Sequence, residues 1–252
     1  MEKKLWTFGC SFTEDSNNFQ HEAPYWKDYL EYKKVKHIPV WSTVLSNLLD
    51  MEDKNFGYGG VGNDYIFEKF LEVSPNLLEG DYVIIQWSSF NRIQFPFNHG
   101  NEFKFNSIHI SNIIAGQSYK DSFPKNVERG IKYLAYVNDS KVKIDEFHER
   151  IEFLIHYCRN RKINLFFWCM DLENLHLVEV VKKYSNYFYN VHGDFNLRDK
   201  MISYNDHLLL KTTIDHDTNG KVVDYHPSEQ GHRLIATFLF EFINSQKDRL
   251  YE

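Results

Sequence analysis

The chain has 252 residues, of which 42% are hydrophobic and 25% charged; these are ordinary values for a globular domain and exclude an intrinsically disordered chain. Its net charge is −6, and its Lys and Arg residues are scattered along the sequence, so the basic stripe of a nucleic-acid-binding protein is missing. No segment reaches the ~20 apolar residues of a membrane-spanning helix. We therefore expect a soluble protein with neither nucleic acid nor membrane as partner.

The cysteines and the N-terminal residues bear on the compartment. Cys10, Cys158 and Cys169 cannot all pair, and their spacing is not that of metal ligands. The apolar run Leu5–Cys10 is too short for the core of a signal peptide. These features suit a reducing compartment and predict a cytoplasmic protein.

The first third of the sequence alternates short apolar runs with amphipathic ones. Leu5–Phe8 is predicted to be a strand that Gly9 ends. Apolar residues between 41 and 48 have helical spacing. A Gly-rich turn is expected around Asn55, followed by a helix over Tyr65–Leu71.

Two later runs have the composition of buried strands. Asp81–Trp87 and Ile163–Met170 are largely apolar and rich in β-branched or aromatic residues, which is typical of strands covered on both faces. Apolar residues from 147 to 158 recur at helical spacing before the second run. A helix over Val178–Tyr184 and a short strand near Phe188–Val191 are expected after it.

The C-terminal part predicts a hairpin and a helix. Asn219-Gly220 favours a tight turn between residues 208–214 and 221–223, because both turn residues tolerate positive φ. Apolar residues from 234 to 243 mark a final helix. Ser228 is suited to be its N-cap.

Strands alternating with helices predict an α/β fold: a flavodoxin-like three-layer α/β/α sandwich with a mostly parallel sheet. We expect one domain over residues 1–252. Residues 93–144 do not follow the alternation, and we interpret them as an insertion or lid within it. In such sheets, active sites gather beyond the carboxyl ends of the strands.

Ser11 follows the first predicted strand in the sequence Gly9-Cys10-Ser11-Phe12-Thr13. A glycine before the serine permits a sharp turn that exposes the hydroxyl above the sheet. A serine nucleophile also needs a neighbouring base, normally a histidine. Taken alone, such a segment is more often a plain strand-to-loop connection, and Cys10 beside the serine could itself be taken for the reactive group.

His226 is the candidate base, in the sequence Asp224-Tyr225-His226-Pro227-Ser228. In an extended segment Asp224 and His226 point the same way, and Pro227 favours extended geometry for the residue before it. The carboxylate would then orient the imidazole. The alternative is a helix N-cap region containing an incidental histidine.

The segment Asn55–Asn63 contains four glycines. They let the backbone approach a ligand and aim its N–H groups at it, as an oxyanion hole requires. A phosphate cradle is the alternative, but the lysine of a P-loop is missing and the dinucleotide fingerprint does not match.

Together these three segments resemble, in order and spacing, the sequence blocks of the SGNH (GDSL-like) hydrolase family. Gly9-Cys10-Ser11 corresponds to the Gly-Asp-Ser block, Asn55 and Gly60 to the Asn and oxyanion Gly of the second block, and Asp224–Pro227 to the Asp-x-x-His-Pro block. The resemblance implies the SGNH fold, Ser11 as nucleophile, His226 as base, and the N–H groups of Ser11 and Gly60 in an oxyanion hole.

The sequence departs from the family pattern in two places. The family's Asp stands three residues before the His, whereas position 223 is Val and Asp224 is one residue closer. The Gly-x-Asn-Asp block after the buried strand is also missing, which leaves Ser88 or Asn91 as the side-chain oxyanion donor. A Ser–His dyad would still be able to react.

Other candidates complete the predicted site. Arg92 could clamp a substrate carboxylate, although an ion-paired surface arginine is the simpler interpretation, and Trp87 is assigned with it to substrate binding. The segment beginning at Asp215 starts like a calcium loop, but its twelfth position is His226 instead of Glu. We expect no metal and no cofactor.

The predicted function is hydrolysis of carboxylic esters, with a small-molecule or carbohydrate ester as substrate, such as a carbohydrate O-acetyl group by the family resemblance. Two alternatives remain open. One is a catalytically weak or inactive module of the same fold that binds a glycan or a protein. The other is an O-acyltransferase that uses the same residues.

Overall fold

A computed structural model describes residues 2–15, 30–31, 34–88, 92–99, 102–109, 140–169, 175–189 and 227–246. Its centre is a parallel sheet of four strands in the order β2-β1-β3-β6. The strands are β1 (Lys4–Gly9), β2 (Glu52–Gly57), β3 (Tyr82–Trp87) and β6 (Asn164–Cys169). This order is that of the flavodoxin-like sheet, and the prediction of an α/β fold is confirmed.

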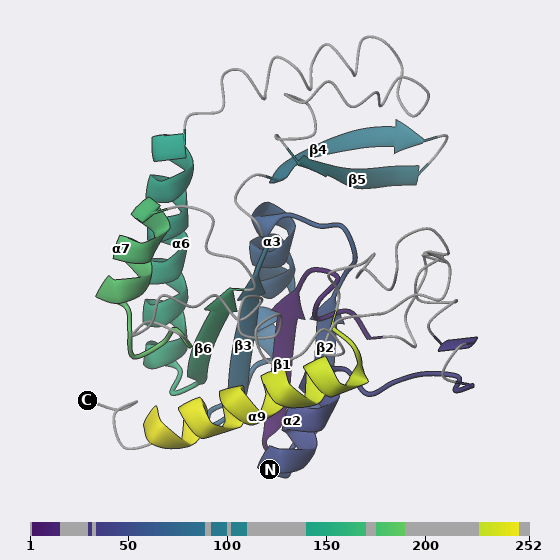
Figure 1. Ribbon diagram of the computed structural model, residues 1–252. Coiled ribbons are helices and arrows are strands. Elements are labelled where there is room, and N and C mark those ends of the chain that lie inside the picture. Colours follow the sequence, from purple (N-terminus) through teal and green to yellow (C-terminus); the bar gives the residue numbers. More distant parts are fainter. Residues whose placement is uncertain are drawn as a thin grey trace.

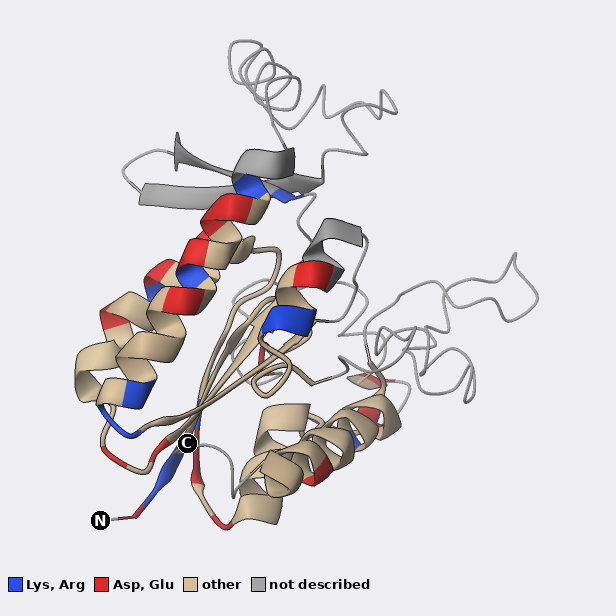
Figure 2. Ribbon diagram, turned by 90° about the vertical axis from the view of Figure 1, so that its left-hand side faces the viewer, with Lys and Arg blue, Asp and Glu red and all other residues tan. Residues whose placement is uncertain are grey.

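Helices cover both faces of the sheet (Figures 1 and 2). One face carries α3 (Asn63–Val73), α6 (Ser140–Asn160) and α7 (Leu175–Lys183). The other carries α2 (Trp41–Leu49) and α9 (Glu229–Gln246). A 3₁₀ turn, η2 (Ser74–Asn76), follows α3. The strand arrows in Figure 1 point toward an antiparallel hairpin formed by β4 (Arg92–His99) and β5 (Glu102–His109).

The two cores follow the two-residue period of the strands. On β3, Val83, Ile85 and Trp87 pack under α3 and α6, whereas Tyr82 and Ile84 face α2 and α9. Because both faces are covered, apolar side chains are required at nearly every position of β3 and β6. This is why the sequence shows both strands as largely apolar runs.

The prediction for the second strand was wrong. The sequence around Asn55 predicted a turn, yet Glu52–Gly57 forms β2, paired in parallel with β1. Among the described strands β2 lies at the edge of the sheet, and most of its residues are half-buried. A half-buried edge strand tolerates the polar sequence Glu-Asp-Lys-Asn, which does not carry the apolar signature of a strand.

The other described elements agree with the sequence patterns. The helices predicted at 41–48, 65–71, 147–158, 178–184 and 234–243 are α2, α3, α6, α7 and α9. The Ser228 hydroxyl accepts a hydrogen bond from the Gly231 N–H (3.2 Å), as expected of an N-cap. Phe188 makes a parallel bridge to Phe167. The hairpin predicted around Asn219-Gly220 lies outside the described residues.

The predicted insertion, residues 93–144, is described in part. It contains most of the β4–β5 hairpin, and α6 begins at Ser140, inside the predicted range. Arg92, at the start of β4, donates a hydrogen bond to the Val61 carbonyl (3.0 Å) and so ties the hairpin to the segment after β2. Its role as an insertion or lid stays a prediction.

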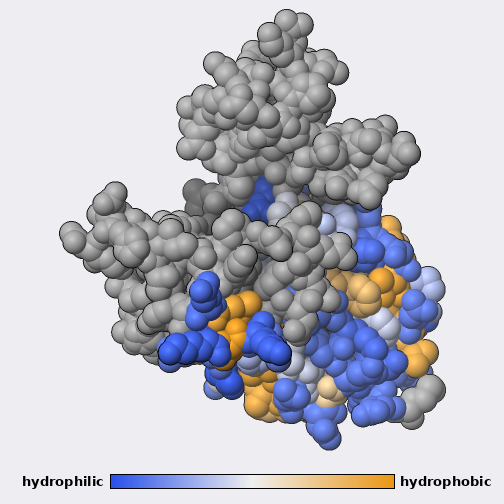
Figure 3. Space-filling view, turned by 90° about the vertical axis from the view of Figure 1, so that its right-hand side faces the viewer, coloured by the Kyte–Doolittle hydropathy of each residue, from blue (hydrophilic) through white to orange (hydrophobic). Residues whose placement is uncertain are grey.

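The described surface is polar and mixed in charge. Acidic and basic residues are interspersed on the helices in Figure 2. Figure 3 shows small, separate hydrophobic patches on the β2 side of the molecule. In the described part of the chain, none of the helices has the length and apolarity needed to cross a bilayer. All three cysteines are buried and unpaired by disulfides, and burial raises the pKa of the Cys158 thiol to about 12.

Candidate active site

The predicted nucleophile lies at the point where the strand order changes direction. From β1 the chain passes to β2 on one side and then to β3 on the other. In open α/β sheets, ligands bind beyond the carboxyl ends of the strands at such a switch point. Ser11 follows β1 by two residues, and Ser88 comes directly after β3.

Ser11 lies within a tight turn. The Cys10 carbonyl accepts hydrogen bonds from the N–H groups of Thr13 (2.8 Å) and Glu14 (3.1 Å). Ser11 is 5% exposed. A Cβ at Gly9 would lie 2.2 Å from Thr13 Oγ1. The turn can close against β1 only because position 9 is glycine.

The Gly-rich segment after β2 packs against this turn. A Cβ at Gly57 would lie 2.5 Å from both the carbonyl carbon of Thr13 and the nitrogen of Glu14, so the two backbones touch there. Gly60 has φ of +77° and open space within 4 Å of its Cβ position. Glycine adopts this left-handed conformation without the steric cost that other residues incur.

Asn55, the second-block Asn of the predicted site, ties β2 to the Ser11 turn. Its Nδ2 group donates to the Thr13 carbonyl (2.7 Å) and to the Ser42 hydroxyl (2.8 Å). Its Oδ1 accepts the Gly57 N–H (2.8 Å). The structure therefore gives Asn55 a positioning role.

Ser88, the residue directly after β3, has a buried hydroxyl. Ser88 is 4% exposed, and its Oγ has no hydrogen-bond partner among the described residues. Its N–H donates to Asn63 Oδ1 (2.7 Å). Because β1 lies between β2 and β3, the segment from Gly57 to Asn63 must cross the end of β1 to make this bond. The Gly-rich segment thus spans the place where the Ser11 turn leaves the sheet.

The two predicted substrate-binding residues have structural contacts. The Arg92 side chain donates a hydrogen bond to the Val61 carbonyl. Its backbone carbonyl accepts a hydrogen bond from Lys143 Nζ (3.4 Å). Trp87 is 1% exposed and packs edge-on against Phe147, with ring centroids 5.0 Å apart. The Trp87 ring is thus held in the core. These contacts do not favour the predicted contact between that ring and a substrate.

His226, Asp224 and Asn91 lie outside the described residues. The described chain resumes at Pro227, and the first turn of α9 is anchored beside α2. His232 is fully buried, and its Nδ1 accepts the Trp41 N–H at the start of α2 (3.2 Å). His232 therefore has a packing role between α9 and α2.

The start of α9 therefore lies at the carboxyl edge of the sheet. Since α2 ends just before β2 begins, its first turn is at that edge. Ser42, in that first turn, is hydrogen-bonded to Asn55, which also contacts Thr13. A continuous set of contacts links the residues that follow His226 to the turn that carries Ser11.

Two polar residues at this edge were not singled out from the sequence. Gln86 is fully buried and contacts the Ser11 turn, and Asn63 contacts Ser88. Gln86 is a polar residue in an otherwise apolar strand, and a buried polar residue of this kind can be noticed in the sequence. Asn63 stands directly after the last glycine of the Gly-rich segment, and only the crossing over β1 reveals its contact.

Asp53, on β2, is a half-buried carboxyl group near the site. Its Oδ2 accepts hydrogen bonds from Thr43 Oγ1 (2.9 Å) and Ser42 Oγ (3.1 Å). Its Oδ1 is buried with no partner among the described residues. Burial raises the pKa of Asp53 above its ordinary value, and the two hydroxyls offset this only in part.

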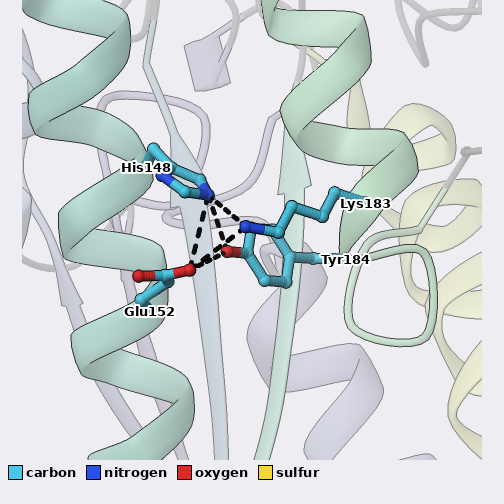
Figure 4. A network of polar contacts seen from close by, with 4 residues as sticks. All are labelled: His148, Glu152, Lys183 and Tyr184. Atoms are coloured by element: carbon cyan, nitrogen blue, oxygen red, sulfur yellow. Dashed lines mark hydrogen bonds and ion pairs between the residues drawn. The ribbon is translucent and has the colours of Figure 1, made fainter.

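A second polar cluster lies away from the site, where α7 packs against α6 (Figure 4). Tyr184 Oη donates to Glu152 Oε1 (2.7 Å), and Lys183 Nζ lies 3.2 Å from the same oxygen and 2.7 Å from His148 Nε2. The hydrogen bonds from Tyr184 and Lys183 lower the pKa of Glu152. Because these groups are mostly exposed, the cluster is a surface connection between helices.

Metal binding has no support in the described part of the chain. There, no three His, Cys, Asp or Glu side chains come close enough together to hold an ion.

No protein-family model matches the chain, and no curated protein matches its sequence. Solved structures do align with it. One, from Desulfitobacterium hafniense DCB-2, is described as a lipolytic protein of the G-D-S-L family (12% identity, TM-score 0.46, covering 95% of this chain and 99% of that one). Another G-D-S-L lipolytic family member, from Veillonella parvula DSM 2008, gives 10% identity and a TM-score of 0.43, covering 95% and 97%.

A third structure, the YXIM protein of Bacillus subtilis, gives 11% identity and a TM-score of 0.49, covering 98% of this chain and 57% of that one. Two of the three descriptions thus name the family that the sequence blocks resemble. At these identities and TM-scores the alignments assign no activity to the chain.

Proposed function

We propose that the chain is a serine hydrolase of the SGNH type that acts on carboxylic esters. The observation that carries the proposal is the place of Ser11: a tight turn at the carboxyl end of β1, at the switch point of the sheet. The Gly-rich segment crosses the same place and brings its glycine backbone beside it.

In the proposed reaction, His226 removes the proton of the Ser11 hydroxyl as its oxygen attacks the ester carbonyl. The resulting oxyanion is held by the N–H groups of Ser11 and Gly60, with the Ser88 hydroxyl or Asn91 as side-chain donor. The tetrahedral intermediate collapses, and the alcohol leaves with the proton from His226. Water, deprotonated by His226, then releases the acid and restores Ser11.

The anchored start of α9 supports the choice of base. His226 precedes Pro227, which lies beside a helix fixed at the carboxyl edge by the bond between His232 and Trp41. The Ser11 turn leaves the sheet at the same edge. Asp224 is proposed to orient the imidazole, and its shifted place in the sequence makes a Ser–His dyad the minimal active form.

Substrates are proposed from the family resemblance: short acyl esters, including O-acetyl groups on carbohydrates. The β4–β5 hairpin, beyond the carboxyl ends of the strands in Figure 1, is the proposed lid or sugar-contacting wall. Arg92 is proposed to hold the Gly-rich segment in place through Val61, with any contact to a substrate carboxylate secondary to that role.

The test combines hydrolysis of p-nitrophenyl acetate with labelling by a fluorophosphonate. Ser11→Ala is expected to abolish labelling and to lower kcat by about 1,000-fold or more, and His226→Gln to do nearly the same. Ser245→Ala and His156→Gln are matched controls, because both residues are exposed on helices away from the site; they should retain full activity.

The outcome also separates the two alternatives. A wild-type protein that neither reacts with the fluorophosphonate nor turns over ester would be a binding module, and the proposal would fail. Release of alcohol that rises when sugar acceptors are added, with acylated sugar as product, would identify an acyltransferase. Full activity of Ser11→Ala would remove Ser11 from the mechanism.

A further inference from the structure

A glutamine occupies a position of β3 where the strand pattern predicts an apolar residue. Gln86 shares a face with Tyr82 and Ile84, which belong to the core under α2 and α9. It is 0% exposed. A buried amide is unfavourable unless its oxygen and nitrogen are both hydrogen-bonded.

The contacts of Gln86 satisfy the amide and surround Ser11. Its Oε1 accepts hydrogen bonds from the Cys10 N–H (3.0 Å), from Cys10 Sγ (3.2 Å) and from Thr13 Oγ1 (3.2 Å). Its Nε2 donates to the Trp87 carbonyl (2.7 Å). One oxygen therefore holds the residue before Ser11 and the residue two positions after it.

This arrangement fixes the peptide group between Cys10 and Ser11. The Cys10 carbonyl accepts from Thr13 and Glu14 inside the turn, and in a trans peptide the following N–H points the opposite way. The direction of the Ser11 N–H is thus set by the Cys10 carbonyl. Gln86 accepts hydrogen bonds from Cys10 and Thr13, which lie at the two ends of this turn.

Glycine at position 9 is part of the same arrangement. A Cβ there would lie 2.7 Å from Gln86 Oε1 as well as 2.2 Å from Thr13 Oγ1. The close approach of Gln86 to the turn therefore requires the glycine of the first sequence block.

We propose that Gln86 is the positioning residue for the nucleophile: its amide oxygen holds the Cys10–Thr13 turn so that the Ser11 hydroxyl and N–H are aimed before the substrate binds. The inference rests on the proposed function of Ser11. A donor that is already aimed does not reorganise during the reaction, so loss of Gln86 affects kcat more than KM.

The experiment compares Gln86→Met with Asp81→Asn, a control change directly before the opposite end of β3. Asp81 is also buried and also accepts hydrogen bonds from the β1 side, at Lys4 N and Trp6 Nε1. Gln86→Met is expected to lower kcat and the rate of fluorophosphonate labelling about 100-fold, with KM within about threefold. Asp81→Asn should lower the melting temperature and leave both rates within about threefold, when each protein is assayed well below its melting temperature.

Gln86→Glu tests the hydrogen bonds within a single folded protein. A protonated carboxyl group can accept from Cys10 and Thr13 and donate to the Trp87 carbonyl, as the amide does. Burial raises the pKa of such a group; once ionised, it has no proton to give that carbonyl. The labelling rate of this variant, relative to wild type, should fall at least tenfold as the pH rises from 6 to 9, and should recover when the pH is lowered.

Each outcome bears on the inference. If Gln86→Met labels as fast as wild type, or loses no more rate than Asp81→Asn, the inference is overturned while the proposed function stands. The inference is also overturned if the labelling rate of Gln86→Glu, relative to wild type, stays constant across the pH range, even if Gln86→Met does not fold. A wild-type protein that neither labels nor hydrolyses ester overturns both proposals.

Discussion

The two ends of the β1–β3 pair are fastened in different ways. At the amino end, Asp81 accepts the N–H of Lys4 (3.0 Å), the indole N–H of Trp6 (2.8 Å) and the N–H of Leu78 (3.0 Å). At the carboxyl end, the neutral amide of Gln86 holds the turn after β1. Gln86 is buried on β3, Asp81 is buried directly before β3, and both fasten β1.

The difference lies in what each end leaves open. The amino end uses a full charge, and hydrogen bonds to charged groups are the stronger kind. At the carboxyl end, the Ser88 hydroxyl has no partner among the described residues, and open space adjoins Gly60. The amino end is closed by hydrogen bonds to a carboxylate, whereas the carboxyl end keeps a buried hydroxyl that has no partner among the described residues.

The largest expected effect on kcat comes from comparing two Gly→Ala substitutions, one at each end of the β1–β3 pair. Gly9→Ala places a Cβ within 2.2 Å of Thr13 Oγ1, whereas Gly80→Ala, at φ of +86°, meets no atom closer than Lys3 Cε at 3.4 Å. We expect Gly9→Ala to lower kcat by about 100-fold or more and to destabilise the fold. Gly80→Ala should cost about 1–2 kcal/mol of backbone strain and leave kcat unchanged.

Ester turnover and urea unfolding of both variants measure these effects. Equal losses of activity at positions 9 and 80 would show that the two ends do not differ in function.

A matched pair of buried serines gives the next effect. Ser88→Ala removes a hydroxyl without a described partner, so stability should change by less than about 0.5 kcal/mol, while kcat falls on the order of 100-fold if the hydroxyl holds the oxyanion. Ser74→Ala removes a hydrogen bond to the Leu71 carbonyl and should cost about 1 kcal/mol with no change in kcat. Full activity of Ser88→Ala would leave Asn91 as the candidate side-chain donor.

The smallest effect concerns Asp53, which is half-buried and accepts fewer hydrogen bonds than Asp81. Because burial raises its pKa in the folded protein, its favourable contribution is complete below the unfolded carboxyl pKa of about 3.9 and is lost as the pH rises through the folded value. Asp53→Asn should therefore gain melting temperature relative to wild type as the pH rises from 4 to 8. Glu79→Gln, at an exposed position, is the control, and parallel curves for Asp53→Asn and wild type would contradict the expectation.

The sequence predicted those elements whose burial determines their composition. β3 and β6 are covered on both faces, so their apolar runs were visible, and the last helix had both its period and its cap at Ser228. β2 was missed because an edge strand needs few apolar residues.

The candidate site was predictable only in part, for a physical reason. Ser11 and Gly60 stand in short blocks whose glycines mark tight backbone. Gln86 and Asn63 act across strands, and such contacts depend on strand order and on the crossing of the Gly-rich segment. The spacing of residues within one segment of the sequence does not reveal such contacts. The pairing of Ser11 with His226 stays a prediction.

The docking of α9 has a consequence for how the protein folds as it is synthesised. The face of the sheet carrying Leu5, Ile84 and Phe166 is closed by Ile235, Leu239 and Ile243 of α9, about sixty residues after the last of the four strands. Until that helix leaves the ribosome, this apolar face is only partly covered, and exposed faces of this kind promote aggregation. Chains interrupted before residue 228 should depend on chaperones, whereas complete ones bury the face in a late, long-range step.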